Sequence, residues 1–312
     1  MLVYACGGSK EKASENNSVP PLRIAPVFDA DSAYAYTQKQ VDFGPRVPGS
    51  SAHYACGNYL SGFLRNCGAV VQEQNFKAVR WDRVEMPARN IIASFKPELK
   101  KRILLMAHWD TRYLADQDTL RKSEPIDGAN DGASGVAVLL EIARQISLNA
   151  DSLQVGVDLL LLDVEDQGNP SESDADSWCL GSQYWSKNKH QANYSAYFGV
   201  LLDMVGARNA RFAREGISRK FAPNVVDKIW STAARLGYQQ YFIPMDAPEI
   251  VDDHYFINTI AQIPTIDIIE YSHGGPVYFG TYWHTHQDNM TIIDPATLKA
   301  VGQTVLTSVY NE

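Results

Sequence analysis

Four short apolar runs, three of which end in polar clusters that contain acidic residues, constrain this fold more than any other feature of the sequence. The runs cover residues 90–95, 102–107, 155–163 and 197–204. They are apolar at consecutive positions, which is typical of strands that are buried on both faces of a parallel sheet. Apolar residues at helical spacing lie between the runs, over 134–146 and 178–186. The sequence therefore predicts alternating strands and helices.

Such an alternation favours a three-layer α/β/α sandwich around a mostly parallel mixed sheet. A further helix is predicted around residues 54–64, and Gly68 just beyond it is a typical helix stop. No linker rich in Pro, Gly or Ser and no internal repeat divides the chain after about residue 20. We therefore expect a single catalytic domain over residues 21–312, preceded by a flexible tether over residues 1–20.

The segment Leu2-Val3-Tyr4-Ala5-Cys6-Gly7 resembles the end of a bacterial lipoprotein signal, with a small residue before the cysteine that is acylated. The polar residues 8–18 that follow suit a tether between a membrane anchor and a folded domain. We therefore expect a lipid anchor at Cys6, on the periplasmic side of a bacterial cell envelope. Three other cysteines remain, without the CxxC spacing of metal sites, and we expect no disulfide framework.

Charge and hydropathy exclude two classes of partner. The formal net charge is −8, and no stripe of Lys and Arg is present to contact phosphates, so we expect no nucleic-acid partner. No run reaches the roughly 18 apolar residues that a membrane-spanning helix needs. A lipid at Cys6 is then the expected contact with a membrane.

The chemistry of the chain is indicated by polar clusters at the ends of the apolar runs. Ligands of an α/β protein gather at the carboxyl ends of its parallel strands, so these clusters are expected to meet. The acidic or histidine-containing clusters are His108-Trp109-Asp110, Glu165-Asp166, Asp203, the turn Asp131-Gly132 and a late Trp283-His284. Zinc prefers histidine nitrogen and carboxylate oxygen, and a catalytic zinc site keeps one position open. Glu165 beside Asp166 allows one carboxylate to bind metal while the other moves protons.

Each of these residues also has an ordinary structural interpretation. Taken singly, Asp131, Asp203 or His284 is more often a helix cap, a turn residue or a surface group than a ligand. Trp178 and Trp283 alone would more often belong to a core than to a pocket. Acids after several apolar strands have no economical structural explanation, because burying their charges costs several kcal/mol without a metal or a partner. The joint pattern therefore favours a metal enzyme.

With these motifs the chain resembles the zinc aminopeptidase (M28-like) superfamily. The motifs are His108-x-Asp110, Asn130-Asp131-Gly132-Ala133-Ser134-Gly135, the double acid, Leu202-Asp203-Met204 and the late His284. Within this superfamily the chain resembles the type II glutaminyl-peptide cyclotransferases, the glutaminyl cyclases of animals and of Bacteroidetes. The resemblance runs from about Tyr36 to the C-terminus and includes Arg46-Val47-Pro48-Gly49-Ser50, Asp252-Asp253-His254 and Trp283-His284-Thr285.

The resemblance implies a role for each site residue. Asp131, Asp166 and His284 are implied to hold one zinc ion, and Glu165 to shuttle protons. Asp203 and Asp252 are implied to hold Glu165 and to steer the substrate amine, and Trp178 and Trp283 to form the walls of the substrate pocket. The implied enzyme, an acyltransferase, acts as a monomer and converts the N-terminal glutamine of peptides and proteins to pyroglutamate with release of ammonia.

Three details qualify this resemblance. The animal enzymes carry Glu where this chain has Asp166, which is a shorter arm but still a hard oxygen ligand. They carry a cysteine where this chain has Ala107, so the animal disulfide cannot form. Zinc hydrolases of this kind often have a cis linkage after the ligand Asp, so we expect a cis bond between Asp131 and Gly132.

Two other functions use almost the same residues. A dinuclear zinc aminopeptidase would place a second zinc on His108, Asp131 and Asp203, and Glu165 would activate a metal-bound water. A catalytically inactive relative that serves as a binding module should have lost the proton shuttle or a ligand, and this chain has lost neither. Trp283 directly before the ligand histidine and the run Asp252-Asp253-His254 favour the cyclase.

Overall fold

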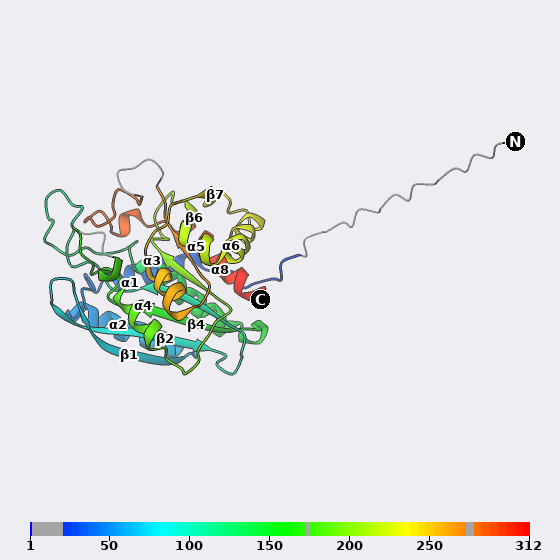
Figure 1. Ribbon diagram of the computed structural model, residues 1–312, viewed down its shortest axis with the longest axis horizontal. Coiled ribbons are helices and arrows are strands. Elements are labelled where there is room, and N and C mark those ends of the chain that lie inside the picture. Colours follow the sequence, from blue (N-terminus) through cyan, green and yellow to red (C-terminus); the bar gives the residue numbers. More distant parts are fainter. Residues whose placement is uncertain (2–20, 172–174, 273–277) are drawn as a thin grey trace.

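A six-stranded sheet forms the centre of the computed structural model, which describes residues 1, 21–171, 175–272 and 278–312 (Figure 1). The strand order is β1-β2-β4-β3-β5-β8. The strands are β1 (Val70–Val79), β2 (Glu85–Phe95), β3 (Arg102–His108), β4 (Gly156–Leu162), β5 (Phe198–Asp203) and β8 (Thr265–Ile269). A separate two-stranded sheet consists of β6 (Phe212–Arg214) and β7 (Phe242–Asp246).

The central sheet is mixed. Strands β4, β3, β5 and β8 run parallel to one another, whereas β1 and β2 pair antiparallel and β2 pairs antiparallel with β4. The carboxyl ends of the four parallel strands therefore share one edge of the sheet, where such folds gather their ligands.

Alternate residues of each central strand serve two separate cores. Along β3, Ile103, Leu105 and Ala107 belong to the larger core, whereas Leu104 and Met106 belong to the smaller one. All five side chains are fully buried. A strand with period 2 can be apolar at every position only if both faces of its sheet are covered, which is the physical reason for the continuous apolar runs.

Helices cover both faces of the sheet. Residues of α1, α2, α3, α6 and α8 pack in the larger core, and residues of α4 and of the turn that follows α7 pack in the smaller one. The helices are α1 (Ala30–Val41), α2 (Ser51–Asn66), α3 (Ala133–Leu148), α4 (Leu180–Lys187), α5 (Gly216–Phe221), α6 (Pro223–Arg235), α7 (Asp253–Phe256) and α8 (Pro295–Tyr310). The predicted α/β/α sandwich around a mostly parallel mixed sheet is confirmed.

The sequence pattern located the central strands better than the edge strands. The run predicted at 102–107 is β3, and the helix predicted at 134–146 is α3 (Ala133–Leu148). Strand β1 was not predicted, because most of its side chains are exposed or only partly buried and it has no apolar run. A strand at the edge of a sheet that is exposed to solvent does not need a continuous apolar run.

Three expectations concern membranes and cysteines. The proposed acylation site, Cys6, lies outside the described residues. No helix among the described residues is long and apolar enough to cross a membrane. Within the described chain Cys56, Cys67 and Cys179 are all free thiols.

Candidate active site and metal centre

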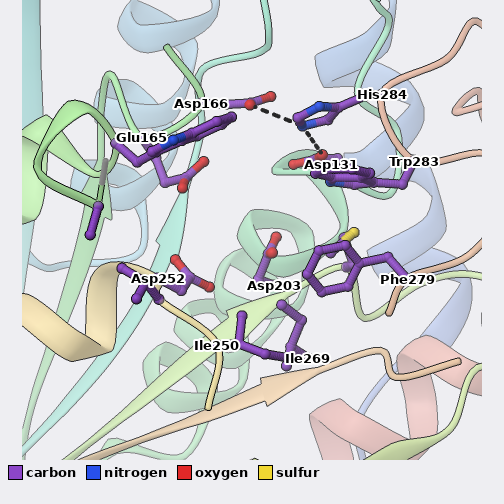
Figure 2. Close-up of a pocket in the computed structure, with 14 residues that line it drawn as sticks. Asp131, Glu165, Asp166, Asp203, Ile250, Asp252, Ile269, Phe279, Trp283 and His284 are labelled. Carbon is purple, nitrogen blue, oxygen red and sulfur yellow. Dashed lines mark ion pairs between the residues drawn. The ribbon is translucent and has the colours of Figure 1, made fainter. Parts of the chain in front are cut away.

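The polar clusters that follow β3, β4 and β5 meet at the shared edge of the sheet (Figure 2). Strand β3 ends in His108 and β5 ends in Asp203, while Glu165 and Asp166 follow β4 after a short turn. Asp110 organises this turn, because its buried carboxylate accepts the backbone N–H of Glu165 at 3.1 Å and of Asp166 at 3.3 Å. The two adjacent acids are thereby held in fixed positions.

The turn before α3 is locked to the ends of the neighbouring strands. Asn130 Oδ1 accepts the backbone N–H of Gly206 at 2.7 Å, and Ser134 Oγ accepts the backbone N–H of Val205 at 3.0 Å. Gly132 adopts a left-handed φ of +92°, and a Cβ atom there would lie 3.0 Å from the carbonyl oxygen of Asp110. Glycine is required where the backbone approaches this closely. The Asn-Asp-Gly-Ala-Ser-Gly motif therefore holds Asp131 in a fixed position.

Asp288 fixes the backbone of Asp131 from the other side. Its carboxylate accepts the N–H of Asn130 at 2.7 Å and the N–H of Asp131 at 3.0 Å. All three residues are buried. Asp131 is therefore held between the sheet and the segment that carries His284, although the two segments are far apart in the sequence.

Asp131, Asp166 and His284 meet at one point and form one of the groups that could hold a metal ion. His284 Nε2 lies 3.2 Å from Asp166 Oδ1 and 3.8 Å from Asp131 Oδ2. Ligand atoms about 2.0–2.1 Å from a tetrahedral zinc stand about 3.3 Å apart, so this spacing fits the ion. Asp166 Oδ2 is buried without a hydrogen-bond partner among the described residues, which also suits a ligand.

A second group that could hold a metal consists of His108, Asp131 and Asp203. His108 Nε2 lies 3.0 Å from Asp131 Oδ1 and 3.2 Å from Asp203 Oδ1. Asp131 belongs to both groups, as a bridging carboxylate would. The ligand set that the aminopeptidase function requires is therefore brought together as well.

Glu165 faces the cavity beside these ligands, and its side chain is 14% exposed. Burial raises the pKa of Glu165 well above its usual value, and the nearby negative charges of Asp252 and Asp166 raise it further, against an opposing effect of His108. A carboxyl group with a raised pKa can accept a proton and release it near neutral pH. The position and the pKa both suit a proton carrier.

Asp203 and Asp252 line the same cavity as Glu165 (Figure 2). The Asp252 carboxylate lies within 4.8 Å of the Glu165 carboxylate, in a group that also contains Cys179. Asp203 instead lies against His108, and burial raises the pKa of Asp203 to about 7. The structure thus places Asp252 next to Glu165, and Asp203 next to His108 within the second metal group.

The segment with Ile250 and Asp252 is anchored by Glu215. This buried carboxylate accepts the N–H of Ile250 at 2.8 Å and lies 3.0 Å from His254 Nε2. It also accepts the N–H of Ile217 at 2.7 Å, at the start of α5. Although burial would raise it, the pKa of Glu215 is lowered to about 2, mainly by His254. The Glu215 carboxylate therefore fixes the segment that carries Ile250 and Asp252, both of which line the cavity.

The three candidate ligands line a cavity of about 320 Å³. Its lining is acidic near the ligands and apolar elsewhere. The lining residues are Asp131, Glu165, Asp166, Ala175, Trp178, Asp203, Met204, Ile250, Val251, Asp252, Ile269, Phe279, Trp283 and His284. Both predicted wall residues, Trp178 and Trp283, are among them, and Trp283 stacks on His284 with 3.7 Å between the ring centroids. Such a cavity fits one small side chain and its backbone amine.

Four residues at this site have a left-handed backbone that only glycine adopts easily. They are Val164, Cys179, Met204 and His284, with φ between +50° and +55°. Each such residue costs about 1–3 kcal/mol and persists only where its surroundings enforce it. His284 is a candidate ligand, Val164 precedes Glu165, Met204 follows Asp203, and Cys179 donates to Glu165, so the strain lies at the candidate site, which is typical of a functional site.

The sequence did not reveal several supporting residues, and one expectation was wrong. Arg112, Asp116 and Asp288 contact the ligands, but no pattern in their polar segments singled them out. Every peptide bond of the described residues is trans, so the expected cis bond after Asp131 is absent. The glycine at 132 makes the sharp turn into α3 by its positive φ instead.

Comparisons with known proteins agree with this geometry. Residues 90–309 match the model of peptidase family M28. The chain is 25% identical to the glutaminyl-peptide cyclotransferase of Drosophila melanogaster over 278 residues, which are 81% of this chain and 73% of that protein. The family match begins within β2 and spans the positions of every predicted zinc ligand.

Bacterial structures are more similar. A glutaminyl cyclase of Bacteroides thetaiotaomicron, crystallised with N-acetylhistamine, is 52% identical, with a TM-score of 0.90 over 93% of this chain and 100% of that chain. A protein of Parabacteroides distasonis described as a Zn-dependent exopeptidase is 49% identical, with a TM-score of 0.90 over the same shares of the two chains. Two relatives of near-equal similarity are thus described differently, one as a glutaminyl cyclase and the other as a Zn-dependent exopeptidase.

Proposed function

This chain belongs to peptidase family M28 and, within it, to the bacterial glutaminyl cyclases, and we propose that it is a zinc-dependent glutaminyl-peptide cyclotransferase. It converts the N-terminal glutamine of peptides and proteins to pyroglutamate and releases ammonia. The observation that carries this proposal is the position of Glu165, a carboxyl group with a raised pKa. It stands beside the group Asp131, Asp166 and His284 in an aromatic-walled cavity.

The reaction needs little from the protein beyond positioning and one proton transfer. The α-amine and the side-chain carbonyl belong to the same glutamine residue, so the pocket has only to fold the side chain back toward the amine. Zinc on Asp131, Asp166 and His284 would polarise that carbonyl as a Lewis acid. We assign one zinc per chain to this group.

Glu165 performs the proton transfer. It accepts a proton from the α-amine as the new carbon–nitrogen bond forms, and it returns this proton to the side-chain nitrogen, which leaves as ammonia. The step consumes no net proton. Asp252 and Asp203 line the cavity next to this path and orient the neutral amine of the substrate by accepting its hydrogen bonds. Trp178 and Trp283 enclose the side chain and exclude water, which would otherwise hydrolyse the polarised carbonyl.

An aminopeptidase is the second candidate function, because the group His108, Asp131 and Asp203 is intact. It would require a second zinc and a metal-bound water as nucleophile. The cyclase is favoured because Trp283, directly before His284, stacks on its ring and lines the cavity, and because the run Asp252-Asp253-His254 is present.

A side-by-side assay with peptides that begin with glutamine or with leucine separates the two functions. We expect ammonia and a pyroglutamyl product from the glutamine peptides, and no free leucine from the leucine peptides. Elemental analysis of the same preparation should find about one zinc per chain, whereas a dinuclear peptidase should hold about two. Free leucine released at a rate comparable to ammonia would overturn the cyclase in favour of the aminopeptidase.

The proposed location is the periplasmic side of a bacterial cell envelope, with a lipid on Cys6 and a monomeric catalytic domain. The sequence Leu2-Val3-Tyr4-Ala5-Cys6-Gly7 supports the anchor. A labelled fatty acid supplied to cells that produce the full-length chain should therefore be incorporated into it, and Cys6→Ala should abolish this label. Cys67→Ala is the matched control, since Cys67 is a free thiol in the described domain. A Cys6→Ala protein that keeps its label would contradict the anchor.

A further inference from the structure

Arg112 is a fully buried cation beside the proposed zinc ligands, and the mechanism above does not use it. Its Nη1 donates to the backbone carbonyl of Asp166 at 3.1 Å and lies 3.4 Å from Asp166 Oδ1. Its Nη2 donates to the carbonyl of Gly168 at 3.3 Å, and its Nε donates to Asp116 Oδ1 at 2.5 Å. The guanidinium thus contacts the proposed ligand Asp166 through Nη1 and Asp116 through Nε, while Nη2 binds the backbone of Gly168.

Asp116 extends this contact to a second ligand. The oxygen that accepts from Arg112 also lies 3.1 Å from Nδ1 of His284. A carboxylate beside the outer nitrogen of a metal-bound histidine fixes the tautomer and the orientation of the ring. The inner nitrogen, Nε2, is then left to face Asp166 at 3.2 Å. Arg112 and Asp116 therefore connect two ligands that lie more than a hundred residues apart in the sequence.

The same guanidinium supports a wall of the cavity. Its central carbon lies 4.5 Å from the centroid of the Trp178 ring, which is within the range of a cation–π contact. The Trp178 ring in turn stacks on His284, with 6.1 Å between centroids. A planar guanidinium can donate in its plane and stack on its face at the same time, which an ammonium group cannot do.

We propose that Arg112 and Asp116 form a clamp that sets the positions of the zinc ligands Asp166 and His284 and of the pocket wall Trp178. Both are positioning residues, because neither lines the cavity. The inference rests on the proposed zinc site, but not on the choice between cyclase and aminopeptidase, since both functions use that site.

The zinc dissociation constant, measured on folded protein by competition with a chelator, tests the clamp without reference to activity. Asp116→Asn keeps the size of the side chain but removes its charge, and it should raise this constant about 10- to 100-fold, as the loss of such an outer carboxylate does. Arg112→Lys keeps the charge but loses the planar fork, and a rise of the same order is expected. The double variant should be less than additive, because the two residues act through one contact.

Arg102→Lys is the matched control. Arg102 is also a buried arginine, and it pairs with Asp158 at 2.6 Å, but it lies at the opposite end of β3 from His108. It should lower thermal stability while leaving the zinc dissociation constant within about twofold of the wild type, as expected for a distant site.

Asp116→Asn decides the test even if Arg112→Lys fails to fold, since the Asp116 side chain is 14% exposed and tolerates an isosteric change. A folded Asp116→Asn protein with wild-type zinc affinity would overturn the clamp. An effect of Arg102→Lys as large as that of Asp116→Asn would also overturn it, because the loss would then reflect general stability. A wild-type protein that binds no zinc would overturn the proposed zinc site itself, and with it the function.

Discussion

Glu165→Gln is expected to lower turnover of glutamine peptides by roughly 10²- to 10⁴-fold, the usual share of a general acid–base, while the fold and the zinc content stay unchanged. Glutamine has nearly the same shape as glutamate, but its amide cannot accept a proton from the amine and return it to the leaving nitrogen. Glu165 is not one of the three proposed ligands, so the metal group remains complete. The measurements are kcat, zinc per chain and thermal stability of the purified variant.

Glu141→Gln is the matched control for the loss of a buried carboxylate. Glu141 is fully buried on α3 and pairs with Arg144 at 2.7 Å, away from the cavity. This variant should lose stability and retain turnover. If Glu165→Gln kept turnover within about tenfold of the wild type, Glu165 would not be the proton carrier, because the smallest share of such a group is about 10².

His284→Ala is expected to remove zinc and to lower activity by about 10³-fold or more. A Lewis-acid metal supplies several kcal/mol of transition-state stabilisation, and each 1.36 kcal/mol corresponds to about tenfold in rate. His284 is also the only nitrogen ligand of the proposed group. Zinc per chain after gel filtration and the rate with a glutamine peptide are measured on the same sample.

His286→Ala is the matched control, because it removes a histidine two residues further along the chain. His286 pairs with Asp118 at 2.9 Å and does not line the cavity, so zinc and activity should persist. His108→Ala tests the metal count, since it should leave zinc unchanged in an enzyme with one zinc and lower it in a dinuclear peptidase. A His284→Ala protein that retained one zinc and full activity would contradict the proposed ligand group.

The sequence by itself determined the fold class and the principal site residues. Strands buried on both faces must be apolar at every position, so β3, β4 and β5 could be recognised from local composition. Acids directly after such strands have few structural uses, and parallel strands bring their carboxyl ends to one edge. Glu165, Asp166 and Asp203 could therefore be named from the strand ends, Asp131 and His284 from other polar clusters, and Asp252 from the family resemblance. The structure brings all six to one cavity.

Only the tertiary structure decided which groups support these residues. Arg112 and Asp116 lie in a polar loop after β3, where no periodic pattern distinguishes a buried guanidinium from an exposed one. Asp288 reaches the backbone of Asp131 across 157 residues of sequence. Val164 has a left-handed backbone, which a β-branched residue rarely adopts, so this conformation is imposed by the packing around it. Local composition sets which segments become strands and helices, whereas contacts between distant segments depend on how those elements pack.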